Sequence, residues 1–412
     1  MVGVKKRKAK SGVKMVDSEG TSRITMIHPG MHQVGGAERL ITDLAIGLAE
    51  EGCKVDLLVG ACNKLWYDQL RRKNSSLSVK EVGVKFPGNP LTWINLEVLT
   101  RSLFRLINPD TDTIFTSGFP SNLILNYSNR LRARHIHYFQ EAPTILHDRE
   151  GQKATNPFYL PIFYRFMTRL YGGSDIRCVR NYDVLMANSN LTRRINAQVY
   201  GLDPADIKVV YPGINIKKFE RPISATPFFS RIVKKSSPVI FFPKGTKFWW
   251  NQLVCLKALE RLRNVDFIAV FTGGTWFEVK SLAMWSKKLG ISQKILWAQV
   301  LSEEELRFIY SRSTIVVSIP RRQPFGLTPL ESIICGSTPI TSRHSGLFEI
   351  MKLEDSANFV DGNDSIELAQ TMEKLITDED LRRKIVFDGR LKIVEEFDGS
   401  KFINRMIKVL LS

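Results

Sequence analysis

The chain has 412 residues, of which 43% are hydrophobic and 24% charged. This composition is typical of a soluble globular protein, and the length exceeds one ordinary core, so we expect two domains. No apolar run approaches the roughly 20 residues needed to cross a bilayer. The formal net charge of +18 favours phosphate-bearing partners in general, without choosing among nucleic acid, anionic lipid and phosphorylated substrates.

The amino terminus and the cysteines indicate the compartment. Residues 1–21 predict a basic disordered tail, with lipid contact as the alternative, and they lack the apolar segment of a secretory signal. The five cysteines are scattered, odd in number and without a Cys-x-x-Cys pair, which predicts buried thiols in a reducing compartment. We therefore expect a cytoplasmic protein, with the cytoplasmic face of a membrane as the other location considered.

The first half alternates strand-like and helix-like segments. Residues 24–28 (ITMIH) predict a strand, Gly35 and Gly36 open a helix with apolar positions every four residues, and residues 54–59 (KVDLLV) predict a second strand. The other strands expected in this half are residues 113–116, 135–139, 184–187 and 208–210. The order indicates a βαβ unit extended into a parallel sheet.

The second half repeats this pattern after a break. Residues 220–237 lack periodicity and hold two prolines, so we place a linker there. Beyond it we expect strands at 239–242, 266–271, 294–297, 314–319 and 338–341, and helices near 251–262, 282–289 and 378–411. The expected domains are an N-terminal domain (22–219), a C-terminal domain (238–390) and a C-terminal helix (391–412) that could return to the first domain. The predicted fold is α/β, with two Rossmann-like parallel-sheet domains facing across a cleft.

The most informative stretch is residues 323–350, QPFGLTPLESIICGSTPITSRHSGLFEI. An apolar strand precedes it, a helix opens at Thr328, and Gly336 ends that helix before the next strand. In open α/β sheets ligands bind at the carboxyl edge of the strands, and the start of a helix favours an anion. The stretch therefore predicts a nucleotide pocket, with Glu331 in the first turn of its helix.

Three blocks of sequence carry a resemblance to a known family. They are HPGMHQVGGAERLITDLAIGLAEEGCKVDLLV, ANSNLTRRI followed by VVYPGINIKKF, and QPFGLTPLESIICGSTPITSRHSG. Together they resemble the GT-B family of retaining glycosyltransferases (glycosyl transferases group 1), and the first block looks most like mannosyltransferases that extend the lipid-linked oligosaccharide. The resemblance implies transfer of a hexose, with mannose favoured, from GDP-mannose or a UDP-hexose to a glycan or lipid-linked acceptor. It also implies that no cofactor and no metal are required.

The resemblance assigns donor-binding roles to glycines and to one acid. Gly35 and Gly36, which permit positive φ and close contact, would let backbone N–H groups approach the donor diphosphate; a tight turn with helix–strand packing is the alternative. Glu331 would be the second acid of the family's Glu-x7-Glu and bind the ribose hydroxyls, since a carboxylate accepts two hydrogen bonds. The run from Thr328 to Glu331 also fits a helix capping box, so that interpretation stays open.

Between the two motif positions, Phe325, Gly326 and Leu327 would line the donor pocket. The first motif position itself departs from the family pattern, because it holds Gln323 instead of an acid. A neutral amide can hydrogen-bond a sugar hydroxyl, but it cannot act as a base or stabilise a cationic sugar by charge. Donor-sugar identity and turnover are the properties that this change would affect.

Four further residues are candidates for the chemistry of transfer. In HIHYFQEAP, Gln140 takes the place of the family histidine near the transferred sugar. His137 is a second candidate, but in a strand it would face away from Gln140, and a core histidine is the alternative. Lys244 and Lys247 would neutralise the departing diphosphate, against the alternative of solvated loop lysines.

Residues 156–173 mix aromatic side chains with Arg165 and Arg169, so we expect an acceptor-side segment able to contact an anionic membrane, or else a buried helix with exposed arginines. The two glutamines motivate a catalytically weak nucleotide-sugar or glycan-binding protein as the alternative function. A nucleic-acid partner is not expected, because the chain lacks an RNA-recognition or helix-turn-helix signature.

Overall fold

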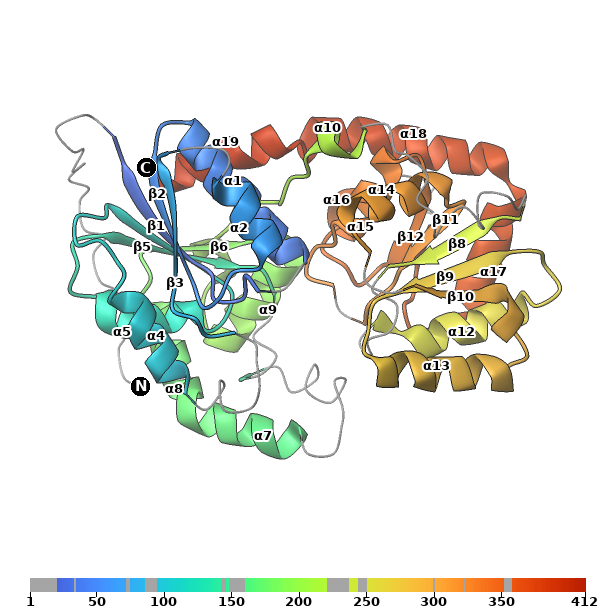
Figure 1. Ribbon diagram of the computed structural model, residues 1–412, viewed down its shortest axis with the longest axis horizontal. Coiled ribbons are helices and arrows are strands. Elements are labelled where there is room, and N and C mark those ends of the chain that lie inside the picture. Colours follow the sequence, from blue (N-terminus) through green and yellow to red (C-terminus); the bar gives the residue numbers. More distant parts are fainter. Residues whose placement is uncertain are drawn as a thin grey trace. The chain divides into compact units, whose positions relative to one another are not determined.

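The computed structural model describes residues 21–32, 35–71, 75–85, 95–141, 146–147, 160–220, 237–243, 250–298, 301–321, 323–351 and 358–412. The described residues form two compact units. The first contains residues up to Gly213 together with Ser400–Ser412, and the second contains Ile214–Gly399. Each unit is built on its own parallel sheet (Figure 1).

The first unit has a seven-stranded sheet in the order β3-β2-β1-β4-β5-β6-β7, and every pairing is parallel. Its strands are β1 (Arg23–Ile27), β2 (Lys54–Val59), β3 (Leu77–Glu81), β4 (Thr113–Ser117), β5 (Arg134–Phe139), β6 (Val184–Ala187) and β7 (Ile207–Val209). The strands expected from the sequence are present, and β3 is an addition. β3 escaped prediction because only Leu77 of its five residues is buried.

Helices cover both faces of the first sheet (Figure 1). One face carries α1 (Gly36–Glu50), α2 (Lys64–Arg71) and α19 (Gly399–Leu410); the other carries α4 (Leu96–Phe104), α5 (Leu125–Ser128), α8 (Gly173–Arg180) and α9 (Asn190–Tyr200). α7 (Leu160–Met167) continues through the π-helical turn Thr168–Gly172 into α8. The C-terminal helix α19 packs Phe402, Met406 and Leu410 into the same core as α1.

The second unit has a six-stranded parallel sheet in the order β10-β9-β8-β11-β12-β13. Its strands are β8 (Val239–Phe242), β9 (Ile268–Thr272), β10 (Ile295–Ala298), β11 (Ile315–Ser318), β12 (Thr338–Ser342) and β13 (Phe359–Val360). α12 (Gln252–Arg261), α13 (Trp276–Lys288) and α17 (Ser365–Thr377) lie on one face (Figure 1). The remaining helices are α10 (Ile216–Phe219), α14 (Glu303–Arg312), α15 (Thr328–Ile334), α16 (Phe348–Met351) and α18 (Glu379–Glu396).

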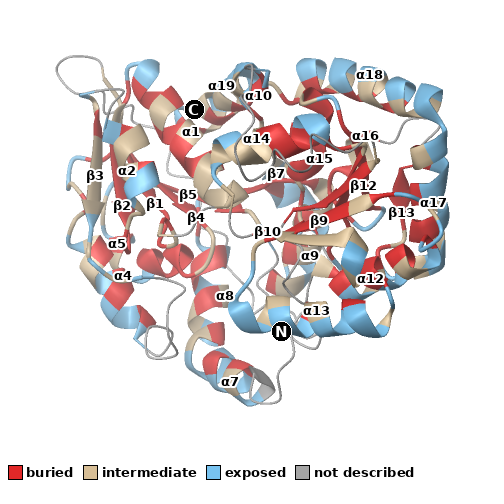
Figure 2. Cartoon of the chain, turned by 45° about the vertical axis from the view of Figure 1, so that its right-hand side comes forward, coloured by how far each residue is buried: buried red, intermediate tan, exposed pale blue. Residues whose placement is uncertain are grey.

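Figure 2 shows the strands of both sheets largely buried and the outer sides of the helices exposed. In each unit the strand order reverses beside the first strand, between β1 and β4 and between β8 and β11. The carboxyl edge at such a reversal is where open α/β sheets bind ligands. Among the described helices, none is both long and apolar enough to cross a membrane.

Two local expectations are corrected. The helix expected at 282–289 begins earlier, at Trp276, because Thr275 and Glu278 form a capping box there. All five cysteines are free thiols, but Cys62 and Cys335 are half-buried instead of buried.

Candidate functional site

Two loops at the carboxyl edge of the second sheet are joined to each other. The loop after β11 and the loop after β12 meet in a parallel bridge between Gln323 and Ser345. The backbone N–H of Gly346 donates to the carbonyl of Gln323 over 3.1 Å, and that of Leu347 donates to the carbonyl of Phe325 over 3.3 Å. The stretch around Gln323 is therefore held in place by backbone hydrogen bonds.

The side chains of Gln323 and Ser345 are enclosed at this junction. Gln323 is 7% exposed and Ser345 2% exposed, and within the described residues Gln323 Oε1 and Ser345 Oγ have no hydrogen-bond partner. Gly326 has a φ of 104°, and a Cβ there would overlap the Gln323 amide, so glycine is required. A buried polar group without a partner costs about 1–3 kcal/mol, which makes these two oxygens candidates for contact with a ligand.

Glu331 lies inside α15 instead of capping it. The N-cap residue is Leu327, no side chain caps the helix, and Thr328 is already the first helical residue. The capping-box interpretation of Thr328 and Glu331 is therefore wrong. Glu331 is buried, and its Oε2 accepts a hydrogen bond from the hydroxyl of Tyr310 over 3.1 Å.

Phe325, Gly326 and Leu327, which lie between Gln323 and Glu331, differ in burial and in role. Phe325 is buried and packs against Phe397, with ring centroids 5.6 Å apart, so its side chain holds the loop to the core. Gly326 and Leu327 are half-buried, which leaves them the part of the loop that a ligand could reach.

Lys244 and Lys247 lie outside the described residues. The next described part of the same connection contains Asn251, which precedes α12 in the left-handed conformation with φ 55°. Its Nδ2 donates to the carbonyls of Ile319 and Gly362 over 2.9 and 2.7 Å, and its Oδ1 accepts from Nε of Arg321 over 3.0 Å. Asn251 thus ties the start of α12 to the ends of β11 and β13 and fixes a guanidinium at the strand reversal.

Asn251, Arg321 and Ser345 were not among the predicted site residues. Asn251 could have been noticed, because asparagine before a helix tolerates the left-handed region. Arg321 could have been noticed as well, because it closely follows the predicted strand 314–319. Ser345 had no such signal, since the pairing of distant loops brings it to Gln323.

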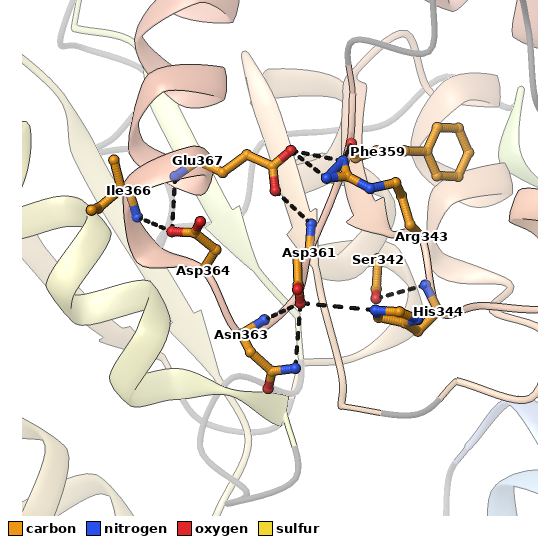
Figure 3. Close-up of polar contacts among 9 residues, drawn as sticks. All are labelled: Ser342, Arg343, His344, Phe359, Asp361, Asn363, Asp364, Ile366 and Glu367. Carbon is orange, nitrogen blue, oxygen red and sulfur yellow. Dashed lines mark hydrogen bonds and ion pairs between the residues drawn. The ribbon is translucent and has the colours of Figure 1, made fainter.

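A polar network supports the loop that carries Ser345 (Figure 3). Arg343 donates to the carbonyl of Phe359 over 2.6 Å and to Glu367 Oε1 over 2.7 and 2.6 Å. Glu367 Oε2 accepts from the backbone N–H of Asp361 over 2.8 Å, and His344 Nε2 lies 3.9 Å from Asp361 Oδ1. The network joins the ends of β12 and β13 to the first turn of α17.

At the carboxyl edge of the first sheet, Gln140 is held by two neighbours. Its Nε2 donates to Ser117 Oγ over 2.6 Å, and its backbone carbonyl accepts from Asn188 Nδ2 over 2.7 Å. Gln140 is half-buried, whereas Ser117 is fully buried. The amide therefore has a fixed orientation at the end of β5.

His28 is a buried neighbour of this group that the sequence analysis did not select. Its Nδ1 lies 3.0 Å from the carbonyl oxygen of Ser117, which can only accept, so Nδ1 must carry the proton. Burial lowers the pKa of His28, although Glu38 and the bond to Ser117 oppose that shift. The neutral ring then keeps its lone pair on Nε2.

His137 occupies the core of the first unit. It is 3% exposed, its Nδ1 lies 2.8 Å from Thr116 Oγ1, and its ring packs on Phe139 and Tyr182 at 4.7 and 5.3 Å between centroids. Burial lowers the pKa of His137 to about 3. These surroundings favour the core-histidine alternative over a part in transfer.

Gly35 and Gly36 begin α1 without positive φ. Gly35 is the N-cap in an extended conformation (φ −150°), and Gly36 is the first helical residue. A Cβ on Gly35 would lie 2.5 Å from Glu38 Oε2. The Glu38 carboxylate thus approaches Gly35 closely, and the extended backbone there involves no left-handed turn. In the described part of the chain, His, Cys, Asp and Glu side chains form no group of three or more that could hold a metal.

Family models match both units. Residues 34–218 match the model "Glycosyltransferase Family 4", and residues 226–392 match "Glycosyl transferases group 1". Among curated proteins, alpha-1,3/1,6-mannosyltransferase ALG2 of Homo sapiens is 20% identical, over 95% of this chain and 96% of that protein. The Dictyostelium discoideum protein of the same name is 21% identical, over 96% of this chain and 100% of its own length.

Solved structures match the whole architecture. Anabaena HepE in complex with UDP and glucose is 17% identical, with a TM-score of 0.73 over 94% of this chain and 99% of its own. Sucrose-phosphate synthase from Thermosynechococcus elongatus is 13% identical, with a TM-score of 0.76 over 94% of this chain and 98% of its own. Two Rossmann-like units and two matching family models, one for each unit, give one conclusion: the chain belongs to the GT-B glycosyltransferases.

Proposed function

We propose that this enzyme is a retaining glycosyltransferase that moves a hexose, with mannose favoured, from a nucleotide-sugar donor (GDP-mannose or a UDP-hexose) to a glycan or lipid-linked acceptor. The observation that supports the proposal most is the pairing of the loops after β11 and β12. Gln323 and Ser345 hold buried side-chain oxygens in these paired loops, and Glu331 supplies a buried carboxylate in α15, which follows the first loop. Similarity to mannosyltransferases over nearly the full length favours mannose as the sugar.

The donor is assigned to the second unit. Glu331 accepts hydrogen bonds from the ribose hydroxyls, and Gln323 and Ser345 accept from hydroxyls of the transferred sugar. Lys244 and Lys247, with Arg321, offset the charge of the diphosphate as it leaves. Gly326 and Leu327 line the pocket.

Transfer breaks the bond between the anomeric carbon and the donor phosphate oxygen and forms one from that carbon to the acceptor oxygen. The acceptor proton passes to the departing phosphate on the same face of the sugar, which preserves the anomeric configuration. No side chain need act as a nucleophile, so a neutral Gln323 is compatible with turnover. Gln140, fixed by Ser117, orients the sugar by hydrogen bonding and not by charge.

The acceptor side is assigned to the first unit and to the cytoplasmic face of a membrane. α7 and the turn after it expose an apolar stripe, with Ile162 73%, Phe166 45% and Leu170 47% exposed. Arg165 and Arg169 are exposed beside this stripe. A basic amphipathic segment of this kind suits the surface of a membrane that holds a lipid-linked acceptor. Of the predicted segment 156–173, residues 156–159 lie outside the described part.

A thermal-shift screen of nucleotide sugars tests the donor assignment, because ligands that bind the native state raise its apparent stability. We expect GDP-mannose or a UDP-hexose to raise the midpoint, and radiolabelled sugar to appear in an extracted lipid-linked acceptor. A nucleotide sugar that binds without transfer or hydrolysis would instead support the second candidate, a nucleotide-sugar or glycan-binding protein. The neutral residues Gln140 and Gln323 favour that candidate.

A further inference from the structure

The helix α13 of the second unit exposes large apolar side chains. Phe277 is 76% exposed, Trp276 65%, Met284 64% and Trp285 40%. The helix is fixed to its unit from the opposite side, where Leu282 and Ser286 are buried. Figure 2 shows the outer side of α13 as exposed. Apolar side chains grouped in this way on a protein surface mark an interaction site.

The exposed side chains have a definite order around the helix. Phe277 and Met284 are seven residues apart, which is close to two turns, so they lie on one line along the helix. By the same periodicity, Trp276 and Trp285 fall on the two sides of that line. The surface therefore has an apolar centre bounded by tryptophans, whose rings combine an apolar body with a polar N–H.

Lysines accompany both tryptophans. Lys280 Nζ lies 4.6 Å from the ring centroid of Trp276, and Lys288 Nζ lies 5.1 Å from that of Trp285. Lys287 adds a third exposed cation in the last turn. A lysine that lies against a tryptophan ring keeps its ammonium beside the apolar surface, where it can meet an anion at the same depth.

The exposed side of α13 carries little negative charge. The single acid of α13 is Glu278, whose carboxylate accepts hydrogen bonds from the backbone N–H and the hydroxyl of Thr275 over 2.7 and 3.0 Å. That carboxylate is part of the capping box at the N-terminus of α13. The exposed side of α13 is thus apolar and basic, without an acid of its own to oppose an anionic partner.

A second helix of the same unit exposes apolar side chains without this charge pattern. α18 also exposes an apolar stripe, with Phe387 64%, Leu391 58% and Val394 49% exposed. Its neighbours carry both signs, including the ion pairs Arg383–Glu379 and Lys392–Glu395. Exposed apolar area is therefore common to both helices, while the one-sided positive charge belongs to α13.

We propose that the exposed side of α13 docks on an anionic lipid bilayer. Phe277 and Met284 enter the boundary between headgroups and acyl chains, the two tryptophans lie at headgroup depth, and the three lysines contact lipid phosphates and carboxylates. This surface lies in the donor-binding unit and is distinct from the basic segment of α7. The inference needs no donor, acceptor or catalysis, so it can fail or hold independently of the proposed transfer.

The test is flotation of the full chain with vesicles of phosphatidylcholine alone and of phosphatidylcholine mixed with phosphatidylserine. One variant replaces the lysines (Lys280→Gln, Lys287→Gln, Lys288→Gln), and another replaces the apolar centre (Phe277→Ser, Met284→Ser). The matched control replaces exposed apolar residues of α18 (Phe387→Ser, Leu391→Ser). All of these side chains are exposed, and circular dichroism with thermal denaturation checks that the variants stay folded.

We expect the wild type and the α18 control to bind the anionic vesicles equally. Loss of three lysines should weaken binding on the order of 100-fold, because each basic residue near an anionic surface contributes about 1 kcal/mol, which is about a fivefold factor. Loss of Phe277 and Met284 should weaken it at least about tenfold. Wild-type binding by either α13 variant, equal binding to neutral vesicles, or capture of a soluble glycan without vesicle binding would overturn the proposal.

Discussion

Gln323 and Ser345, on the loops after β11 and β12, form a parallel bridge, and each holds a buried side-chain oxygen without a hydrogen-bond partner in the described part of the chain. Folding has removed these oxygens from water, and a bound sugar could supply the missing donors. The junction is kept rigid by backbone hydrogen bonds and by the network around Arg343 and Glu367. The two oxygens therefore lower the stability of the ligand-free protein, while the proposed donor complex needs them as hydrogen-bond acceptors.

Ser345→Ala should separate the effect on stability from the effect on donor binding. The substitution removes a buried oxygen that has no partner, so the melting temperature without ligand should stay equal or rise, while KM for the donor should increase about fivefold for one lost hydrogen bond of about 1 kcal/mol. Steady-state kinetics and calorimetry measure the two effects. Ser337→Ala is the matched control: Ser337 Oγ donates to the carbonyl of Ser313 over 2.8 Å, so its loss should lower the melting temperature. A fall in stability for Ser345→Ala with unchanged KM would contradict the assignment.

Gln323→Glu should restore the acid that the family carries and alter donor choice or turnover. Because position 323 is 7% exposed, burial should raise the pKa of the new carboxyl and lower the stability of the ligand-free protein. Rates with a panel of nucleotide sugars, measured across pH, check this. Identical rates and donor preference for the variant and the wild type would place Gln323 away from the sugar.

Glu331→Ala should weaken donor binding by about 10- to 100-fold, since hydrogen bonds to a charged group contribute about 1.5–3 kcal/mol. Isothermal titration calorimetry with the donor measures the change. Tyr310→Phe tests the hydrogen bond between Tyr310 and Glu331, because it removes only the hydroxyl that donates to Glu331 Oε2. That variant should lose about 1 kcal/mol of stability and keep donor affinity within about threefold. Unchanged affinity in Glu331→Ala would leave this carboxylate with a structural role alone.

His137 should make the first unit acid-sensitive. The pKa of His137 is about 3 in the folded chain and 6.5 without burial, so below 6.5 the unfolded chain binds a proton that the folded chain does not. Stability is then fully present above pH 6.5 and falls as pH drops towards 3. Between pH 7 and pH 5 the loss is about 2 kcal/mol from this residue.

His137→Gln should remove that part of the slope, as measured by urea denaturation at a series of pH values. Between pH 7.5 and 9 the two curves should run parallel, which serves as the internal reference. Parallel curves between pH 7 and 5 as well would show that His137 is not held neutral by its burial.

The sequence predicts most of the architecture because buried parallel strands are continuous apolar runs. KVDLLV and VIFF are strands over the predicted residues, and the order of strands and helices leads to two parallel sheets. β13 could not be predicted in this way, because Phe359–Val360 is too short to show a period. The interpretation of Thr328 as an N-cap failed because α15 begins one residue earlier than a cap at that position requires.

The candidate site is predictable only in the parts that lie together in sequence. Gln323 and Glu331 share one motif, so their spacing could be compared with a family. Ser345 reaches Gln323 through a bridge between two loops, and Asn251 reaches Ile319 and Gly362 through its side chain. Such long-range contacts depend on the packed sheet and leave no periodic trace in the sequence.

The most direct test of the central claim is the configuration of the product formed from a radiolabelled nucleotide sugar and a lipid-linked glycan acceptor. The account predicts transfer of mannose with the anomeric configuration of the donor retained, read from the one-bond C1–H1 coupling of the product. Tight donor binding without transfer or hydrolysis, or a product of inverted configuration, would contradict it.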